Sequence, residues 1–293
     1  MIIKTMLTAI KPFQLLSIAA TYLLGAGLVQ YVRGMRSWTA FFQGLTFLLL
    51  MMISLELLRL IQFHSNPQNW PIGTSLRDAR QLRITLAMVA ATLLTVAAAI
   101  YIDWVLRGIV WQGLVLILVM ILLFGTAYFL AQYKERLKPY QLLLEVFLFV
   151  VMPPGAAFFL QSDDPHRLLT LIVVCLVPAF LAYRILIQLK GYGQDAKYEV
   201  KTLVTNIGWE KAMAYHNALI LLTYFLFALT TFWGFPWFIV WPVFLTLPIG
   251  LLEIWLMERV KRGQKPLWKV MQAATISVYF ITIYMIGFAF WIR

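Results

Sequence analysis

Acidic residues are scarce in this sequence, with only 12 Asp and Glu residues among 293. Two of them, Asp195 and Glu199, have the four-residue spacing that places carboxylates on one face of a helix. Paired carboxylates are suited to Mg²⁺, a hard cation that prefers oxygen ligands. The three His residues lack the spacing of a metal or haem site, and the single Cys175 says nothing about redox compartment. The candidate chemistry therefore rests on a few carboxylates.

Hydropathy determines the environment in which these carboxylates must work. Hydrophobic residues make up 62% of the chain and charged residues 12%, a composition typical of an integral membrane protein. About 20 apolar residues are needed for a helix to cross a bilayer, and nine stretches meet this requirement. The predicted spans are 12–32, 38–63, 84–102, 109–132, 141–161, 168–189, 212–233, 236–257 and 268–291. We expect an all-α, nine-helix bundle and a single membrane domain over residues 1–293.

The basic residues predict the orientation of these spans. With the N-terminus placed in the cytoplasm, 19 of the 24 Lys and Arg residues fall on the inner face. This bias and contact with anionic lipid explain the net charge of +12 without nucleic acid as a partner. An alternative explanation of the basic residues is that they form a positively charged entrance to a site for a phosphorylated substrate. We expect a protein of a bacterial cytoplasmic membrane, with two longer inner loops at residues 64–83 and 190–211.

Three segments share a pattern with a known family. They are residues 11–13 at the start of the first span, residues 133–155 with Pro139 and Glu145, and residues 195–203 followed by Ile207-Gly208. Together they resemble the UbiA superfamily of intramembrane prenyltransferases, particularly its menaquinone-type branch. The resemblance extends over essentially the whole chain.

The resemblance implies a bundle that transfers a polyprenyl group from its diphosphate to an aromatic or quinol precursor, a step of quinone biosynthesis. In this family Mg²⁺ bridges two motifs, Asn-x-x-x-Asp-x-x-x-Asp and Asp-x-x-x-Asp, to the leaving diphosphate. Loss of diphosphate leaves an allylic cation, which a dry apolar tunnel must protect from water. The implied ligands are Mg²⁺ and a polyprenyl diphosphate.

The helix that should carry the first motif departs severely from it. Glu56, Leu60 and His64 occupy the three motif positions. Leu cannot bind Mg²⁺, and His prefers softer metals. Glu56 is therefore the one candidate metal ligand here, and Arg59, one helical turn away, offers it a different partner.

The second motif is also incomplete. Gly191 stands at its first Asp position and Asp195 at its second. Asp195 is the retained metal ligand, and Glu199 offers a shifted Asp-x-x-x-Glu pair for catalysis. Loss of the remaining acids suggests impaired chemistry or a pseudoenzyme.

Cations and cavity residues complete the predicted site. Tyr133 and Glu145 are candidates to line the cavity, and a carboxylate such as Glu145 is costly in a span unless paired or hydrated. Structural anchoring of Glu145 is an equal alternative. Four lysines are candidates to bind diphosphate, taking over part of the role of Mg²⁺: Lys134, Lys190, Lys197 and Lys201.

Three classes of function are compatible with these residues. The first is a divergent prenyltransferase. The second is a non-catalytic relative that binds a quinone, isoprenoid, pigment or other lipid, either as a carrier or as a subunit of a larger membrane complex. The third is a transporter that shares only its nine spans with the family.

Overall fold

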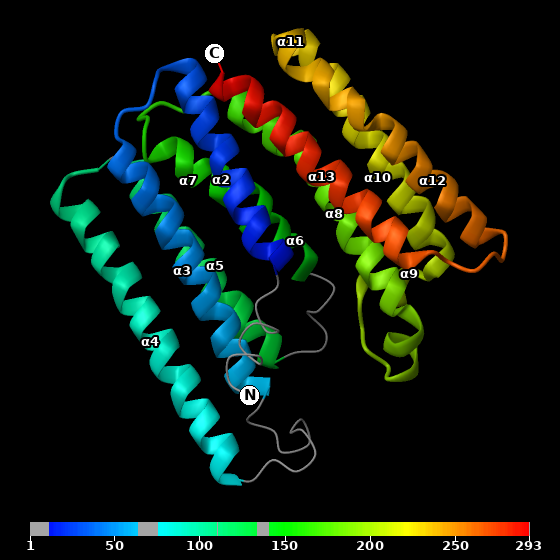
Figure 1. The fold of residues 1–293 in the computed structure, drawn as a ribbon, viewed down its shortest axis with the longest axis horizontal. Helices are drawn as coiled ribbons and strands as arrows, with labels where there is room; N and C mark the ends of the chain where they lie inside the picture. The colour runs from blue at the N-terminus through cyan, green and yellow to red at the C-terminus, as the bar shows by residue number, and fades with distance from the viewer. Residues whose placement is uncertain (1–11, 64–75, 110, 134–140, 293) are drawn as a thin grey trace.

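The computed structural model describes residues 12–63, 76–109, 111–133 and 141–292. The described part is helical and contains no strand (Figure 1). The elements are α2 (Pro12–Val32), α3 (Trp38–Phe63), α4 (Leu76–Leu106), α5 (Trp111–Tyr133), α6 (Gln141–Val146), η3 (Phe147–Val151), α7 (Met152–Phe159), α8 (Arg167–Lys197), α9 (Leu203–Ile207), α10 (Trp209–Thr230), η4 (Thr231–Trp233), α11 (Trp237–Val240), η5 (Trp241–Thr246), α12 (Leu247–Lys261) and α13 (Trp268–Trp291).

Eight helical stretches within the described residues are long and apolar enough to cross a membrane. Helix α5 corresponds to the fourth predicted span. The apolar stretch found in it, 111–123, is shorter than a membrane span requires, so the total of nine spans stays a prediction. Two predicted boundaries were wrong. Helix α4 begins at Leu76, eight residues before the predicted span, and α8 runs to Lys197 through the beginning of a predicted loop.

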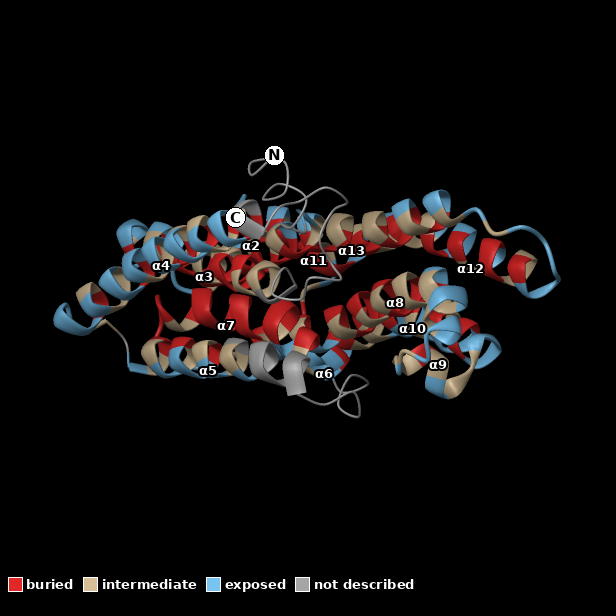
Figure 2. Cartoon of the chain, turned by 90° about the horizontal axis from the view of Figure 1, so that it is seen from below, coloured by how far each residue is buried: buried red, intermediate tan, exposed pale blue. Residues whose placement is uncertain are grey.

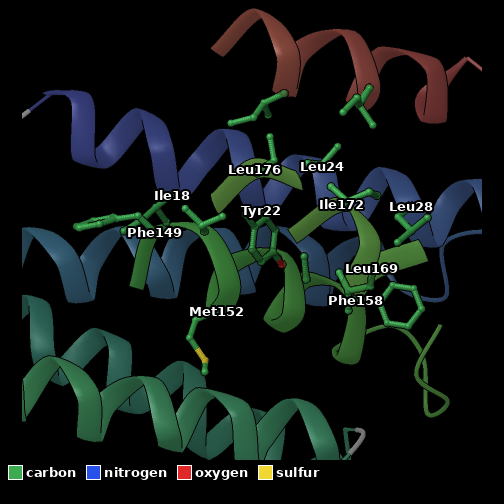
Figure 3. Packing of buried hydrophobic residues seen from close by; sticks show 14 of the residues in the cluster. Ile18, Tyr22, Leu24, Leu28, Phe149, Met152, Phe158, Leu169, Ile172 and Leu176 are labelled. Carbon is green, nitrogen blue, oxygen red and sulfur yellow. The ribbon is translucent and has the colours of Figure 1, made fainter. Parts of the chain in front are cut away.

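The helices pack around α2, which lies between two groups. Helices α3, α4, α5 and α7 lie on one side of it, and α8, α10, α12 and α13 on the other (Figure 1). Buried residues concentrate on α2, α7 and α8, whereas α4 and α5 are exposed along their outer faces (Figure 2). In the close view, Ile18 and Tyr22 of α2 lie in one buried cluster with Phe149 and with Ile172 of α8, and the side chain of Met152 points away from Tyr22 (Figure 3).

A proline pair distorts the fifth predicted span. Pro153 has no N–H to donate to the carbonyl of Phe149, and the preceding residues form the π-helix η3. The hydroxyl of Thr21 in α2 donates to that carbonyl at 3.0 Å. The backbone group that proline frees is therefore satisfied by a neighbouring helix, as an apolar membrane interior requires.

One end of the bundle carries three ion pairs. They join residues of the short connections 33–37, 103–108 and 162–167, which fall at the same end of the bundle when the predicted spans alternate in direction. Their side of the membrane stays a prediction. The pairs are Arg33–Asp164 at 2.9 Å, Arg36–Asp163 at 3.4 Å and Arg107–Asp103 at 2.8 Å.

The contact between α2 and α7 provides a test of this packing. A Cβ atom at Gly25 would collide with the backbone of Pro154, so Gly25→Val should force the helices apart. We expect a loss of about 1–3 kcal/mol or more, the usual cost of overpacking. Unfolding by SDS in bicelles measures it. Gly125→Ala is the control, since a Cβ there meets nothing within 4 Å; equal stability of the two variants would contradict the packing.

Candidate functional site

The C-terminal end of α8 positions the residues predicted to form the second motif. Asp195 lies on the helix and is half-buried, whereas Glu199 lies beyond its end, is exposed, and has a φ of 53°. The N–H of Val200 bonds to the carbonyl of Asp195 at 2.8 Å, and the N–H of Glu199 to that of Ala196 at 3.4 Å. This is the Schellman arrangement, in which the left-handed position favours glycine. Because the helix ends at Lys197, Asp195 and Glu199 do not share a helix face.

The predicted first motif lies on α3, and its acid is already paired. Glu56 is buried, and its carboxylate accepts a hydrogen bond from Arg59 at 2.7 Å. Leu60, at the second motif position, is partly buried. His64, at the third, lies outside the described residues. This end of α3 thus presents a neutralised ion pair.

Glu145 forms the second buried ion pair, with an arginine from another helix. Arg184 of α8 approaches it with two nitrogens, Nη2 to Oε1 at 2.8 Å and Nε to Oε2 at 2.5 Å. Gln141 donates to Oε1 at 3.4 Å. The contact through Nη2 is a hydrogen bond and the contact through Nε is an ion pair, and together they hold the two charged groups against each other. The sequence analysis did not predict Arg184 as a site residue. The feature that could have identified it is an arginine within an apolar span, close to a span that carries a carboxylate.

A cavity of about 230 Å³ opens beside this ion pair. Arg184 and Lys201 bring positive charge to it, and Glu145 brings negative charge. Gln188 also borders it and accepts a hydrogen bond from the N–H of Val204 at 3.2 Å, which holds α9 against α8. The remaining lining residues are Gln141, Leu142, Val200 and Thr202. The cavity is therefore polar, and cations outnumber carboxylates on its wall.

The other predicted lysines are dispersed. The exposed Lys190 donates to Gln272 of α13 at 3.2 Å, and the exposed Lys197 lies 5.7 Å from the ring centre of Tyr198. Lys134 lies outside the described residues. Tyr133 ends α5, and its side chain is likewise not described. Of the four lysines, Lys201 is the one that the structure places on the cavity wall.

The described residues do not fit a diphosphate-bridging Mg²⁺ site. Among them, no group of three or more His, Cys, Asp or Glu side chains is close enough to hold a metal ion. Glu56 and Glu145 are each bound by an arginine. Asp195 lies on α8 and Glu56 on α3. These two helices have different main partners, because α3 packs mainly on α4 and α8 mainly on α10.

An apolar groove of about 410 Å³ lies between α2 and α13. Leu23 and Leu24 form one wall, and Phe280, Tyr284 and Phe288 contribute to the other. Trp291 closes one end and donates its indole N–H to the carbonyl of Leu23 at 3.1 Å. Its dimensions and lining suit a hydrocarbon chain.

Comparison with solved structures identifies the fold. A digeranylgeranylglyceryl phosphate synthase is similar with a TM-score of 0.58 and 14% identity, covering 99% of this chain and 98% of the other. A UbiA homologue from Aeropyrum pernix K1 gives 0.55 and 15%, covering 95% and 97%. A UbiA homologue from Archaeoglobus fulgidus, bound to GPP and Mg²⁺, gives 0.54 and 15%, covering 96% and 99%. The chain has the UbiA fold. No protein-family model and no curated protein matches the sequence.

The Glu145–Arg184 pair makes a stability prediction. Arg184→Met should cost about 3–5 kcal/mol, because it leaves a buried carboxylate without its counter-charge. Adding Glu145→Met should restore most of that loss, because the double variant buries no charge. Unfolding in bicelles gives the double-mutant cycle. Additive losses would show that the two side chains do not interact.

The conformation of Glu199 makes a second prediction. Glu199→Gly should stabilise the protein by about 1 kcal/mol, because glycine adopts a positive φ without steric cost. Lys197→Gly, two residues earlier and still within α8, should destabilise it by about the same amount. Thermal unfolding in detergent compares the two. A destabilised Glu199→Gly would indicate that the carboxylate makes contacts essential to the fold.

Proposed function

We propose that this chain is a member of the UbiA superfamily, related to its menaquinone-type branch, that binds an isoprenoid or quinone-type lipid and has impaired or lost Mg²⁺-diphosphate chemistry. Its membrane is the bacterial cytoplasmic membrane, with the N-terminus in the cytoplasm. The UbiA homologue from Archaeoglobus fulgidus was solved with GPP, and it supports an isoprenoid as the ligand class here.

The neutralisation of the acids carries this proposal. A metal ligand must offer a free carboxylate, yet Glu56 and Glu145 are bound by Arg59 and Arg184. Freeing either acid would leave a partly buried guanidinium without its partner, which is costly in an apolar environment. Asp195 alone cannot replace a set of oxygen ligands from two helices.

The apolar groove between α2 and α13 supports a lipid ligand. It accepts a hydrocarbon chain without a charged lining, so it is compatible with a quinone or an isoprenoid. The function is then that of a carrier or of a ligand-binding subunit in a larger membrane complex. The transporter hypothesis assumed a likeness limited to the number of spans, and the shared fold over nearly the whole chain counts against it.

One observation favours a second candidate, a divergent prenyltransferase. Arg184 and Lys201 both border the polar cavity and would supply positive charge toward a diphosphate. Guanidinium and ammonium groups bind phosphate oxygens without a metal. Under this second candidate function, the chain still binds the prenyl diphosphate that donates the prenyl group, and its activity depends less on Mg²⁺.

Binding of a long-chain prenyl diphosphate to the purified protein, with Mg²⁺ and with a chelator, separates these cases. We expect the affinity to change less than about threefold between the two conditions, because no Mg²⁺ bridge forms. Gly287→Phe should weaken binding by about tenfold or more, since Gly287 borders the groove. Leu221→Phe, at an exposed position on α10, is the matched control.

Markedly tighter binding in Mg²⁺, lost in Asp195→Asn, would overturn the proposal and restore the ordinary enzyme. Binding that is indifferent to Mg²⁺ but lost in Lys201→Gln, with product formed from an added quinol precursor, would establish the divergent prenyltransferase instead. Equal affinity for the prenyl alcohol and the diphosphate would support a carrier or ligand-binding subunit.

A further inference from the structure

A fully buried polar cluster lies between α10, α12 and α13, away from the candidate site. Nε2 of His216 and Oε1 of Glu253 are 2.8 Å apart, and neither side chain has any exposed surface. The hydroxyl of Thr275 in α13 contacts the same Oε1. The sequence placed His216 and Glu253 in apolar spans and assigned neither to the predicted site.

The neighbouring Asn217 determines where one hydrogen of His216 lies. Its amide nitrogen donates to the Glu258 carboxylate at 3.2 Å, so its amide oxygen faces Nδ1 of His216, 3.3 Å away. An amide oxygen only accepts hydrogen bonds. Nδ1 of His216 therefore carries a hydrogen.

The contact between His216 and Glu253 then requires a second proton. A neutral imidazole with its hydrogen on Nδ1 presents a bare Nε2, and an ionised carboxylate presents a bare oxygen. Two acceptors do not approach to 2.8 Å without a proton between them. Either Glu253 is protonated and donates to Nε2, or His216 is doubly protonated and donates to Oε1. The two forms contain the same number of protons and have a net charge of zero.

The surroundings favour that neutral state. Three methionines belong to the adjoining core cluster: Met213 is three residues before His216, Met257 four residues after Glu253, and Met271 four residues before Thr275. Among the described residues, Glu253 Oε2 has no hydrogen-bond partner, an arrangement that is most costly for an ionised carboxylate.

Other polar groups near the cluster are few. Helix α8 faces the adjoining core with Ile185, Leu186 and Leu189, and its Lys190 bonds to Gln272 at the exposed surface. The remaining titratable groups near the pair are Glu258, reached through Asn217, and Tyr224, whose hydroxyl bonds to Thr246. Among the described residues, no counter-charge for a net charge on the pair lies in direct contact with it.

We propose that His216 and Glu253 form an intramembrane proton-binding site, which holds one proton more than an ionised Glu and a neutral His. Above about pH 6.5 the unfolded chain holds its Glu ionised and its His neutral. Folding therefore takes up one proton, and stability falls as pH rises. The equilibrium constant for unfolding should increase about tenfold per pH unit while the folded pair keeps its proton.

The proton itself is observable in the intact protein. The chain has three His residues, so ¹⁵N-histidine labelling in liposomes gives few signals, and His216→Gln identifies the one from His216. We expect a hydrogen on Nδ1 of His216 and an unchanged signal between pH 7 and 9. A hydrogen on Nε2 with Nδ1 bare would overturn the proposal, because Nε2–H would then donate to an ionised Glu253 and the extra proton would be absent.

The pH dependence provides the second test, with a matched variant. In Glu253→Gln the amide NH₂ donates to the bare Nε2 of His216, so the contact survives without the extra proton. This variant should lose the tenfold-per-unit slope between pH 7 and 9. Thr275→Val removes only the neighbouring hydroxyl and should keep the slope. Equal slopes in the wild type and Glu253→Gln would overturn the proposal, and if Glu253→Gln does not fold, the ¹⁵N measurement on the wild type decides alone.

Discussion

The absence of hydrogen-bonding solvent in a bilayer is the constraint on which the structure depends. Each polar group inside an apolar span must find its partner within the protein. The carbonyl of Phe149, left without its helical donor by Pro153, receives the hydroxyl of Thr21 from another helix. The same constraint pairs Glu145 with Arg184 and joins His216 to Glu253. Packing and electrostatics are thus linked at these positions, because helix crossings place the partners within reach.

The same constraint acts on the acids at the positions that the resemblance assigns to the site. A diphosphate-bridging metal needs several free carboxylates on facing helices, each stabilised by the metal. Of the acids that the structure describes as buried, Glu56 is paired with Arg59 and Glu145 with Arg184, whereas Glu253 contacts His216. An Arg–carboxylate pair is neutral without a further ligand. The apolar groove between α2 and α13 is lined by none of these acids, so the proposed binding of a lipid does not require them.

The second motif illustrates where sequence reasoning was limited. The residues from 190 onward were predicted to be a loop because glycine and polar residues follow the sixth span, yet α8 continues to Lys197. Packing of α9 against α8 through Gln188 and Val204 holds this end of the helix in place. Asp195 and Glu199 were predicted as a pair within that loop, whereas the structure places Asp195 on α8 and Glu199 beyond the end of the helix, at a positive φ. Helix propensity at a membrane surface is weak, so tertiary contacts decide where such a helix stops.

The sequence by itself determined the class of protein, the approximate positions of most spans, the likeness to UbiA proteins and the scarcity of acids. The class of protein, the spans and the scarcity of acids follow from hydropathy and residue counts, whereas the likeness to UbiA proteins rests on the three segments that resemble that family. The tertiary structure decided which charges neutralise one another. Arg184 lies 39 positions from Glu145, and His216 lies 37 positions from Glu253. Such pairs depend on how helices cross, and hydropathy along one helix contains no information about its partner. For that reason the number of acids was readable from the sequence, whereas their availability for chemistry was not.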